Sequence, residues 1–140
     1  FDGCEALTSI NIPNSVTEIG EYAFCGCEAL TSINIPNSVT EICDKAFYDC
    51  HSLTSINIPN SVTKIGKGAF DGCESLKEII LFQTDPSKIE VSDRFGSELP
   101  NAQITLYVPK GSVIAYQEHW FWSNCAAIYP LPMICSNNLI

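Results

Sequence analysis

The stretch from Cys4 to Phe24 reads CEALTSINIPNSVTEIGEYAF, and the chain repeats it twice more with few changes. The phenylalanines that recur with it, Phe1, Phe24, Phe47 and Phe70, lie 23 residues apart (24 − 1, 47 − 24 and 70 − 47). A fixed period of this length is typical of a solenoid, in which each repeat forms one coil. Because a single coil cannot bury its apolar side alone, the core must form between stacked coils.

The first half of each coil predicts a short strand. The segment Ser9-Ile10-Asn11-Ile12 alternates polar and apolar residues, which is the two-residue period of a strand with one buried face. Ser9 and Asn11 should therefore point outward while the two isoleucines enter the core. Pro13 should end the strand, because proline cannot donate a hydrogen bond to a parallel ladder.

The second half of each coil returns along the back of the solenoid. It contains Val16 and Ile19, three residues apart, followed by Gly20 and the Ala23-Phe24 pair. This spacing predicts a turn and a short, tight helical segment. Each coil would therefore have a strand in front and a compact return segment behind.

The repeated positions carry a family resemblance. The pattern Leu7-x-x-Ile10-x-Ile12-Pro13-x-x-Val16-x-x-Ile19, closing on Ala23-Phe24, resembles the BspA-like class of leucine-rich repeats over roughly residues 1–81. The resemblance implies a right-handed solenoid whose short parallel strands line one, usually concave, face. The asparagine of the general leucine-rich repeat is replaced, as in this class, by Ser15, Ser38 and Ser61. We therefore expect a β-rich α/β repeat solenoid, with short helical or turn segments behind the strands and a C-terminal cap.

The fourth copy marks the end of the regular array. Phe82 replaces the proline of the earlier copies, and Gln83-Thr84-Asp85-Pro86 replaces their turn. Residues 104–109 predict one more strand, with Leu106 and Val108 inward. We therefore predict leucine-rich repeats over residues 1–93, and the last strand with a capping region over residues 94–140.

A short helix is predicted over residues 110–116, with Val113, Tyr116 and Trp120 at helical spacing. The terminal coil of a solenoid needs a cover. We assign that role to Trp120 and Trp122, because bulky aromatic side chains mostly supply burial. An aromatic binding site is the alternative for these two residues.

The charge balance narrows the range of partners. The formal net charge is −9, from seven basic and sixteen acidic residues, so a phosphate backbone would be repelled and nucleic acid is a poor candidate. Glu18, Glu41 and Lys64 form one column of charges, which we interpret as a solvated face. No apolar run reaches the length of a membrane span, so we expect no membrane insertion of this segment.

Half of the eight cysteines share one repeat position: Cys4, Cys27, Cys50 and Cys73. Parallel Cβ vectors give poor disulfide geometry. We therefore expect small buried thiols that fill a narrow interior, with disulfide bonding as the alternative.

The remaining cysteine patterns offer little support for a metal site. Cys25-x-Cys27 and Cys50-His51 have the residue types of a zinc site, but no complete ligand set recurs. We predict no metal and no cofactor. Outside the repeats, Cys125 and Cys135 are our candidate disulfide, which would tie down the tail.

Catalysis needs dissimilar groups that converge on one point, whereas a repeat distributes similar groups along a line. The two histidines, His51 and His119, lie in no recognisable nucleophile motif. Glu78 is the one acid expected on the strand face, and a glycosidase requires two. We therefore predict no catalytic residues.

The outward strand residues form the predicted binding face. Their hydroxyl and amide groups can bind an extended protein segment or a glycan, or they can simply solvate a sheet. Variation between coils, which specific recognition requires, is concentrated at the irregular end of the face. The candidate binding residues are Ser9, Asn11, Ser32, Asn34, Ser55, Asn57, Lys77, Glu78, Ile80, Phe82 and Tyr107.

The family resemblance implies a non-catalytic binding or adhesion domain of a secreted or cell-surface protein, with an extracellular protein or glycan as partner. The alternative is a passive spacer within a larger surface protein. A third interpretation is weak self-association through the open apolar edge of the first coil at Phe1.

Overall fold

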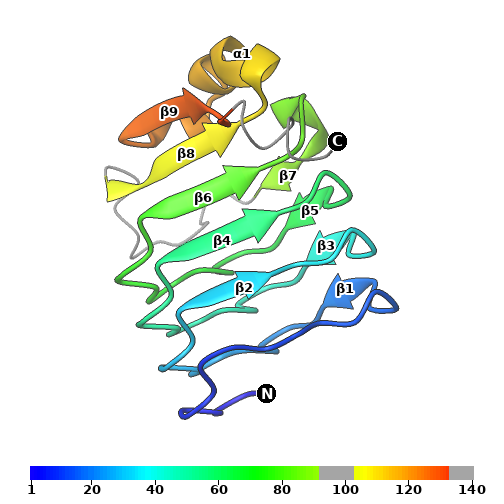
Figure 1. The fold of residues 1–140 in the computed structure, drawn as a ribbon, viewed down its shortest axis with the longest axis vertical. Helices are drawn as coiled ribbons and strands as arrows, with labels where there is room; N and C mark the ends of the chain where they lie inside the picture. Colours follow the sequence, from blue (N-terminus) through cyan, green and yellow to red (C-terminus); the bar gives the residue numbers. More distant parts are fainter. Residues whose placement is uncertain (92–102, 133–140) are drawn as a thin grey trace.

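The computed structural model describes residues 1–91 and 103–132, which form a stack of coils with one parallel sheet in front and a second behind (Figure 1). The front sheet, in spatial order, contains β2 (Ser32–Asn34), β4 (Ser55–Ile58), β6 (Glu78–Leu81), β8 (Thr105–Val108) and β9 (Ala127–Pro130). The back sheet contains β1 (Glu18–Ile19), β3 (Glu41–Ile42), β5 (Lys64–Ile65) and β7 (Glu90–Val91). This architecture confirms the predicted repeat solenoid with parallel strands.

The strand register follows the sequence period. Ser32 pairs with Ser55, and Asn34 pairs with Asn57, so equivalent residues of successive coils lie side by side. β6 continues the ladder with Glu78 beside Ser55. The first coil contributes only an isolated bridge, from Asn11 to Asn34, to the described part of this sheet.

The back of each coil differs from the predicted helical segment. Short i to i−3 bonds do form, with the Ala23 N–H donating to the Gly20 oxygen at 3.1 Å. However, Tyr22 (φ 59°) and Gly26 (φ 73°) adopt left-handed conformations, which a right-handed helix cannot continue. The backbone bonds instead to the next coil, as where the Phe24 N–H donates to the Ala46 oxygen at 2.7 Å. The return segment is therefore a series of turns beside a two-residue strand.

The core lies between the two sheets and consists of repeated columns of apolar side chains. The phenylalanine rings stack almost parallel, with centroids 5.6, 5.3 and 5.4 Å apart along the column Phe1, Phe24, Phe47 and Phe70. Each inner ring is buried and is covered on both faces by its own copies. Stacking the same residue in every coil makes the interfaces between coils alike.

The C-terminal cap contains 3-10 helices over Lys110–Ser112 and Trp122–Asn124 and the helix α1 (Val113–Glu118). Tyr116 and Trp122 are fully buried, and their rings meet edge to face at 6.2 Å. The Tyr116 hydroxyl donates to the Gln83 carbonyl oxygen at 2.7 Å, which ties the helix to the fourth coil. These contacts confirm the capping role of Trp122.

The predicted capping role of Trp120 is wrong. α1 ends at Glu118, so the helical spacing that placed Trp120 beside Tyr116 does not extend that far. Trp120 consequently has 61% of its surface exposed.

The predicted boundary between residues 93 and 94 and the cysteine Cys135 lie outside the described residues. The domain boundary and the disulfide from Cys125 therefore stay predictions. Within residues 1–91 and 103–132, no helix combines the length and the apolar composition needed to cross a membrane.

Candidate functional site

The outward residues of the front sheet form a polar row across the first three coils. Ser9, Asn11, Ser32 and Asn34 are exposed as predicted, because the pleat that buries Ile33 turns its neighbours outward. Ser55 and Asn57 are half-buried. These side chains line a hollow of about 410 Å³ on the face of the sheet.

The asparagines of this row bond to one another. Asn57 Nδ2 donates to Asn34 Oδ1 at 2.8 Å, and the parallel register brings their side chains together. A primary amide has two N–H donors and a carbonyl with two lone pairs, so one such bond leaves further capacity on each group. The row can therefore stabilise the stack and still offer donors and acceptors to a ligand.

The threonines beside the row hold the coils together. Thr54 Oγ1 lies 3.2 Å from the Thr31 carbonyl oxygen, and donates to it across one repeat. On the far side of the coil, Thr40 and Thr63 donate in the same way to Thr17 and Thr40. These hydroxyl groups are engaged in contacts between coils, unlike those of the serines in the row.

A second hollow of about 510 Å³ adjoins the polar row near the C-terminal ends of the front strands. It shares Asn34 and Asn57 with the first hollow and reaches the side chain of Phe82, 44% of which is exposed. Because the two hollows have these residues in common, they lie side by side on the front face of the solenoid. We call this surface, from Ser9 to Phe82, the strand-face trough.

Sequence reasoning missed part of the trough. Asn37, Pro59 and Asn60 line its second hollow, although they belong to the turns that follow the strands. The signal was present in the repeated Pro-Asn-Ser sequence, which places an amide just beyond the end of each strand.

Beyond the trough, the sheet face becomes chemically varied. Lys77 and Glu78 are exposed at the start of β6, while Ile80 is half-buried between them and Phe82. Tyr107 on β8 lies 6.2 Å from Tyr129 on β9, measured between ring centroids. β9 was not predicted, although a proline closes Ala127-Ile128-Tyr129-Pro130, much as Pro59 follows β4 and Pro109 follows β8.

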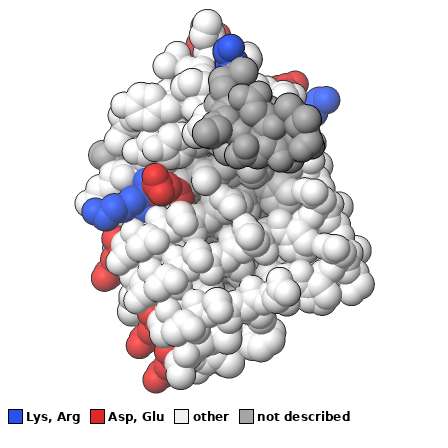
Figure 2. Space-filling model, viewed as in Figure 1, with Lys and Arg blue, Asp and Glu red and all other residues white. Residues whose placement is uncertain are grey.

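Charged residues gather mainly along the margins of the molecule. Figure 2 shows a largely uncharged central surface, with acidic groups following one edge. On the back sheet, Glu18, Glu41, Lys64 and Glu90 stand in register, and Lys64 Nζ lies 3.9 Å from Glu41 Oε2. The charged side chains therefore lie mainly on the back and edges of the solenoid, where water can solvate them, and the centre of the trough is largely uncharged.

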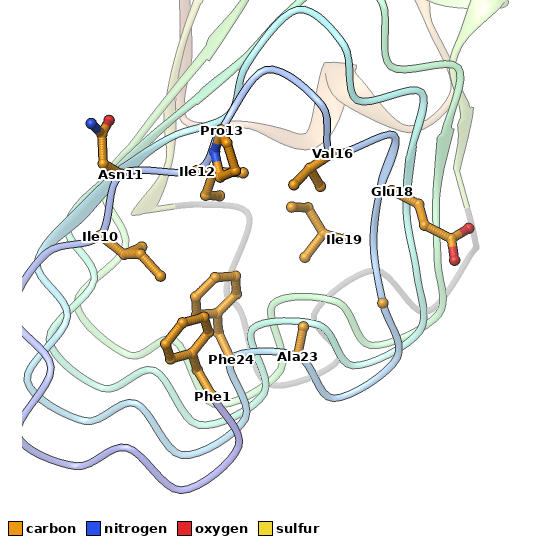
Figure 3. Close-up of a pocket in the computed structure, with 11 residues that line it drawn as sticks. Phe1, Ile10, Asn11, Ile12, Pro13, Val16, Glu18, Ile19, Ala23 and Phe24 are labelled. Atoms are coloured by element: carbon orange, nitrogen blue, oxygen red, sulfur yellow. The ribbon is translucent and has the colours of Figure 1, made fainter.

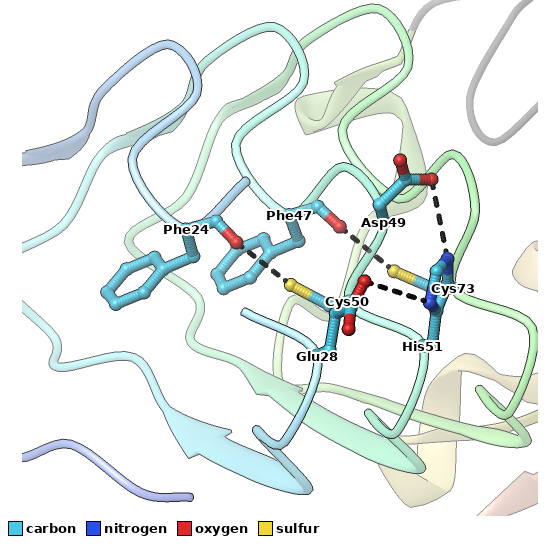
Figure 4. Close-up of polar contacts among 7 residues, drawn as sticks. All are labelled: Phe24, Glu28, Phe47, Asp49, Cys50, His51 and Cys73. Carbon is cyan, nitrogen blue, oxygen red and sulfur yellow. Dashed lines mark hydrogen bonds and ion pairs between the residues drawn. The ribbon is translucent and has the colours of Figure 1, made fainter. Parts of the chain in front are cut away.

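The cysteine column is built into the contacts between coils. Cys50 Sγ–H donates to the Phe24 carbonyl oxygen, and Cys73 Sγ–H donates to that of Phe47, both at 3.1 Å (Figure 4). A hydrogen bond with Cys50, together with burial, raises the pKa of Cys73. The prediction of small buried thiols is confirmed for Cys27, Cys50 and Cys73, whereas Cys4 is partly exposed.

The histidine of the repeat array, His51, lies in a turn. His51 Nδ1 is 3.8 Å from Glu28 Oε1, and its Nε2 is 3.6 Å from Asp49 Oδ1 (Figure 4). Among the described residues, no group of three or more histidine, cysteine or acidic side chains is arranged to hold a metal ion.

The apolar end of the first coil forms a third hollow, of about 260 Å³. Figure 3 shows Phe1, Ile12, Val16 and Phe24 around it. Their counterparts in the second coil, such as Ile35 and Val39, are buried. Self-association through this surface stays a prediction that sedimentation velocity over a range of concentrations tests.

Comparison with known proteins identifies the repeat. A family model described as the BspA type leucine-rich repeat region matches residues 1–126, with six copies. No curated protein matches the sequence significantly.

Three solved structures share the fold. A leucine-rich cell surface protein from Faecalibacterium prausnitzii A2-165 is 44% identical over 56% of this chain and 21% of its own length, with a TM-score of 0.55. A leucine-rich repeat protein from T. pallidum is 24% identical over 99% of this chain and 72% of its own, with a TM-score of 0.67. A third, from Bacteroides ovatus ATCC 8483, is 22% identical over 92% of this chain and 38% of its own, with a TM-score of 0.54. The chain thus spans about a fifth of the F. prausnitzii protein.

Proposed function

Because the chain belongs to the BspA-type leucine-rich repeat family, we propose that it is a non-catalytic binding domain of a cell-surface protein, and that its strand-face trough holds an extended segment of an extracellular protein. The F. prausnitzii relative, a leucine-rich cell surface protein, supports this location. The two adjoining hollows of the trough, the second of which reaches exposed Phe82, are the observation that carries the proposal.

The chemistry of the trough suits a polypeptide backbone. Asn34 and Asn57 offer amide donors and acceptors at the spacing of neighbouring strands, which are about 4.8 Å apart in a sheet. An extended peptide presents alternating N–H and C=O groups that such amides can bind. The shallow polar centre would therefore supply hydrogen bonds of low side-chain specificity.

Specificity would come from the irregular end. Phe82 and Tyr129 are exposed aromatic side chains, and aromatic residues are enriched where protein interfaces have their strongest contacts. Lys77 and Glu78 add one charge of each sign at the margin. A partner with an apolar anchor beside paired charges would fit this end better than a uniform chain.

The test is a binding screen of the intact chain against fibronectin, laminin and collagen, with Asn34→Lys and Phe82→Ala variants measured in parallel. Asn34→Lys places a long cation in the trough, and Phe82→Ala removes the anchor. We expect each variant to weaken a positive interaction by about tenfold, which corresponds to roughly 1.4 kcal/mol. Surface plasmon resonance gives the dissociation constants.

Matched controls place comparable substitutions outside the trough. Asn14→Lys changes an exposed asparagine outside the hollows, and Ile114→Ala truncates an exposed apolar side chain on α1. Both controls should bind as the unmodified chain does. If the trough variants also bind unchanged, or if no member of the panel binds, the domain is better described as a spacer.

A further inference from the structure

A separate hollow lies at the C-terminal end of the molecule, away from the strand-face trough. It has a volume of about 440 Å³ and is lined by residues of the back sheet and of the loop after α1: Ser87, Ile89, Glu90, Val91, His119 and Trp120. This volume falls in the range of small-molecule sites, about 300–1,000 Å³.

Trp120 gives this hollow an aromatic wall that is both exposed and held in place. Its ring meets that of Phe121 edge to face at 5.6 Å and 71°, and Phe121 is itself buried. The His119 ring lies 5.7 Å away at a tilt of 30°. An indole that keeps 61% of its surface in solvent despite these contacts is preorganised for stacking.

His119 supplies a hydrogen-bond donor whose orientation is fixed. Its Nδ1 accepts from the backbone N–H groups of Phe121 and Trp122, at 3.1 and 3.4 Å. Nδ1 can accept only when unprotonated, so the ring proton of the neutral imidazole is on Nε2. Burial lowers the pKa of His119, which favours this neutral form. Among the described residues, no acceptor bonds to Nε2.

The lining of the hollow also includes hydrogen-bond acceptors. Glu90 provides an exposed carboxylate, and Ser87 Oγ donates to Asp85 Oδ1 at 2.7 Å, which leaves the Ser87 oxygen lone pairs available. The hollow thus combines an exposed aromatic ring with a hydrogen-bond donor and with acceptors. Its charge, with Glu90 on the wall and a chain total of −9, disfavours an anionic ligand.

We propose that this hollow binds a neutral saccharide, with the C–H face of a sugar ring on Trp120 and its hydroxyl groups bonded to His119 Nε2–H and the Glu90 carboxylate. A sugar ring has an apolar face surrounded by groups that both donate and accept, which matches this arrangement. A peptide segment could place an apolar side chain on Trp120, but it would form fewer hydrogen bonds with His119 Nε2–H and the Glu90 carboxylate. The site is independent of the strand-face trough.

The experiment uses the full chain and four neutral oligosaccharides, cellotetraose, maltotetraose, mannotetraose and chitotetraose, with an anionic hyaluronan tetrasaccharide for comparison. Isothermal titration calorimetry gives affinity, and acrylamide quenching of tryptophan fluorescence reports on exposed Trp120 against buried Trp122. We expect at least one neutral saccharide to bind and to protect Trp120 from the quencher. Trp120→Ala should weaken binding by about tenfold or more, and Trp120→Phe by less, since a smaller aromatic face remains.

Three further variants sharpen the result. His119→Asn retains an acceptor for the backbone N–H groups but removes the Nε2 donor, so it should weaken saccharide binding while preserving the fold. Tyr129→Ala removes another exposed aromatic residue, and Asn34→Lys disrupts the strand-face trough; both should bind saccharide normally. The proposal is overturned if no neutral saccharide protects Trp120, if Trp120→Ala binds equally well, or if only the anionic tetrasaccharide binds. Since Asn34→Lys tests the trough alone, each proposal can fail without the other.

Discussion

The regular coils and the C-terminal end of the molecule, from β8 onward, continue the same parallel hydrogen-bond ladder, but their buried side chains pack differently. In the regular coils each buried residue contacts its own copy, as where the Phe47 and Phe70 rings stack at 5.4 Å. At the closing end, β8 and β9 continue the parallel sheet, but Phe121 and Trp122 meet at 86°. The comparison shows that backbone hydrogen bonds maintain the strand register in both regions. Identical buried side chains are needed only where one coil stacks on another coil of the same kind.

This contrast has a consequence for how the two regions would respond to damage. A side chain in the array is held by equivalent neighbours on both sides, so its loss disturbs two interfaces between coils. Residues of the cap are not repeated, so each one forms contacts that occur nowhere else in the molecule. The following predictions test this comparison, from the largest expected effect to the smallest.

Phe47→Ala should give the largest loss of stability. Phe47 is buried between Phe24 and Phe70, with ring centroids at 5.3 and 5.4 Å, so its removal leaves a cavity in the middle of the stack. We expect the free energy of unfolding to fall by about 3–5 kcal/mol, measured by urea denaturation. Phe1→Ala is the control, because Phe1 is 63% exposed and stacks on one side only. Equal losses in both variants would contradict the importance of two-sided stacking.

Tyr116→Phe should have a smaller effect at the cap. It retains the buried ring but removes the hydroxyl that donates to the Gln83 oxygen at 2.7 Å. The free energy of unfolding should fall by about 0.5–1.5 kcal/mol, the usual net contribution of such a bond. Tyr22→Phe, at an exposed residue of the array, should leave it unchanged. A chemical denaturation curve distinguishes these outcomes, and an unaltered Tyr116→Phe curve would show that the helix is held by packing alone.

Acid should weaken the cap before the array. Burial lowers the pKa of His119 from its ordinary value of 6.5, so the unfolded chain takes up a proton at a higher pH than the folded chain does. Stability contributed by neutral His119 is therefore complete above pH 6.5 and is lost as the pH falls through the folded pKa. Thermal unfolding from neutral to mildly acidic pH should show this loss. In His119→Asn, whose amide oxygen can still accept from the backbone, the decline should flatten; a decline of the same size would assign it to other groups.

Lys64→Gln should have the smallest effect. Lys64 relieves a column of carboxylates on the back sheet and pairs with Glu41 at 3.9 Å, but both side chains are substantially exposed. We expect a loss below about 1 kcal/mol at low salt, which should shrink as added salt screens the charges. Denaturation at two salt concentrations measures it. A loss that is large and independent of salt would mean that Lys64 acts through packing of its aliphatic chain.

Much of the fold could be predicted because the same signal occurs several times. The phenylalanine period fixed the coil length, and the alternation around Ile33 and Ile56 correctly placed the front strands. The back strands could not be found in this way, since two residues such as Glu18 and Ile19 are too few to show an alternation.

The structure of the C-terminal cap was harder to predict, because its sequence pattern is not repeated elsewhere in the chain. Trp120 and Trp122 are the same residue type two positions apart, yet one is exposed and the other buried. Their difference depends on where α1 stops, and the ends of helices are weakly encoded in sequence. For the candidate site, the outward serines and asparagines were predicted from the pleat, whereas Asn37 and Tyr129 required the turn geometry and the unpredicted β9.

The reactivity of the cysteine column would report how the coils of this solenoid separate. Cys27, Cys50 and Cys73 are buried and bonded to the carbonyl groups of the preceding coil, so a soluble alkylating reagent can reach each one only when its coil separates from that neighbour. Cys4, at the equivalent position of the first coil, is partly exposed, so it should react without such a separation. The order in which the four thiols are alkylated would therefore show the order in which the coils separate, without any added label.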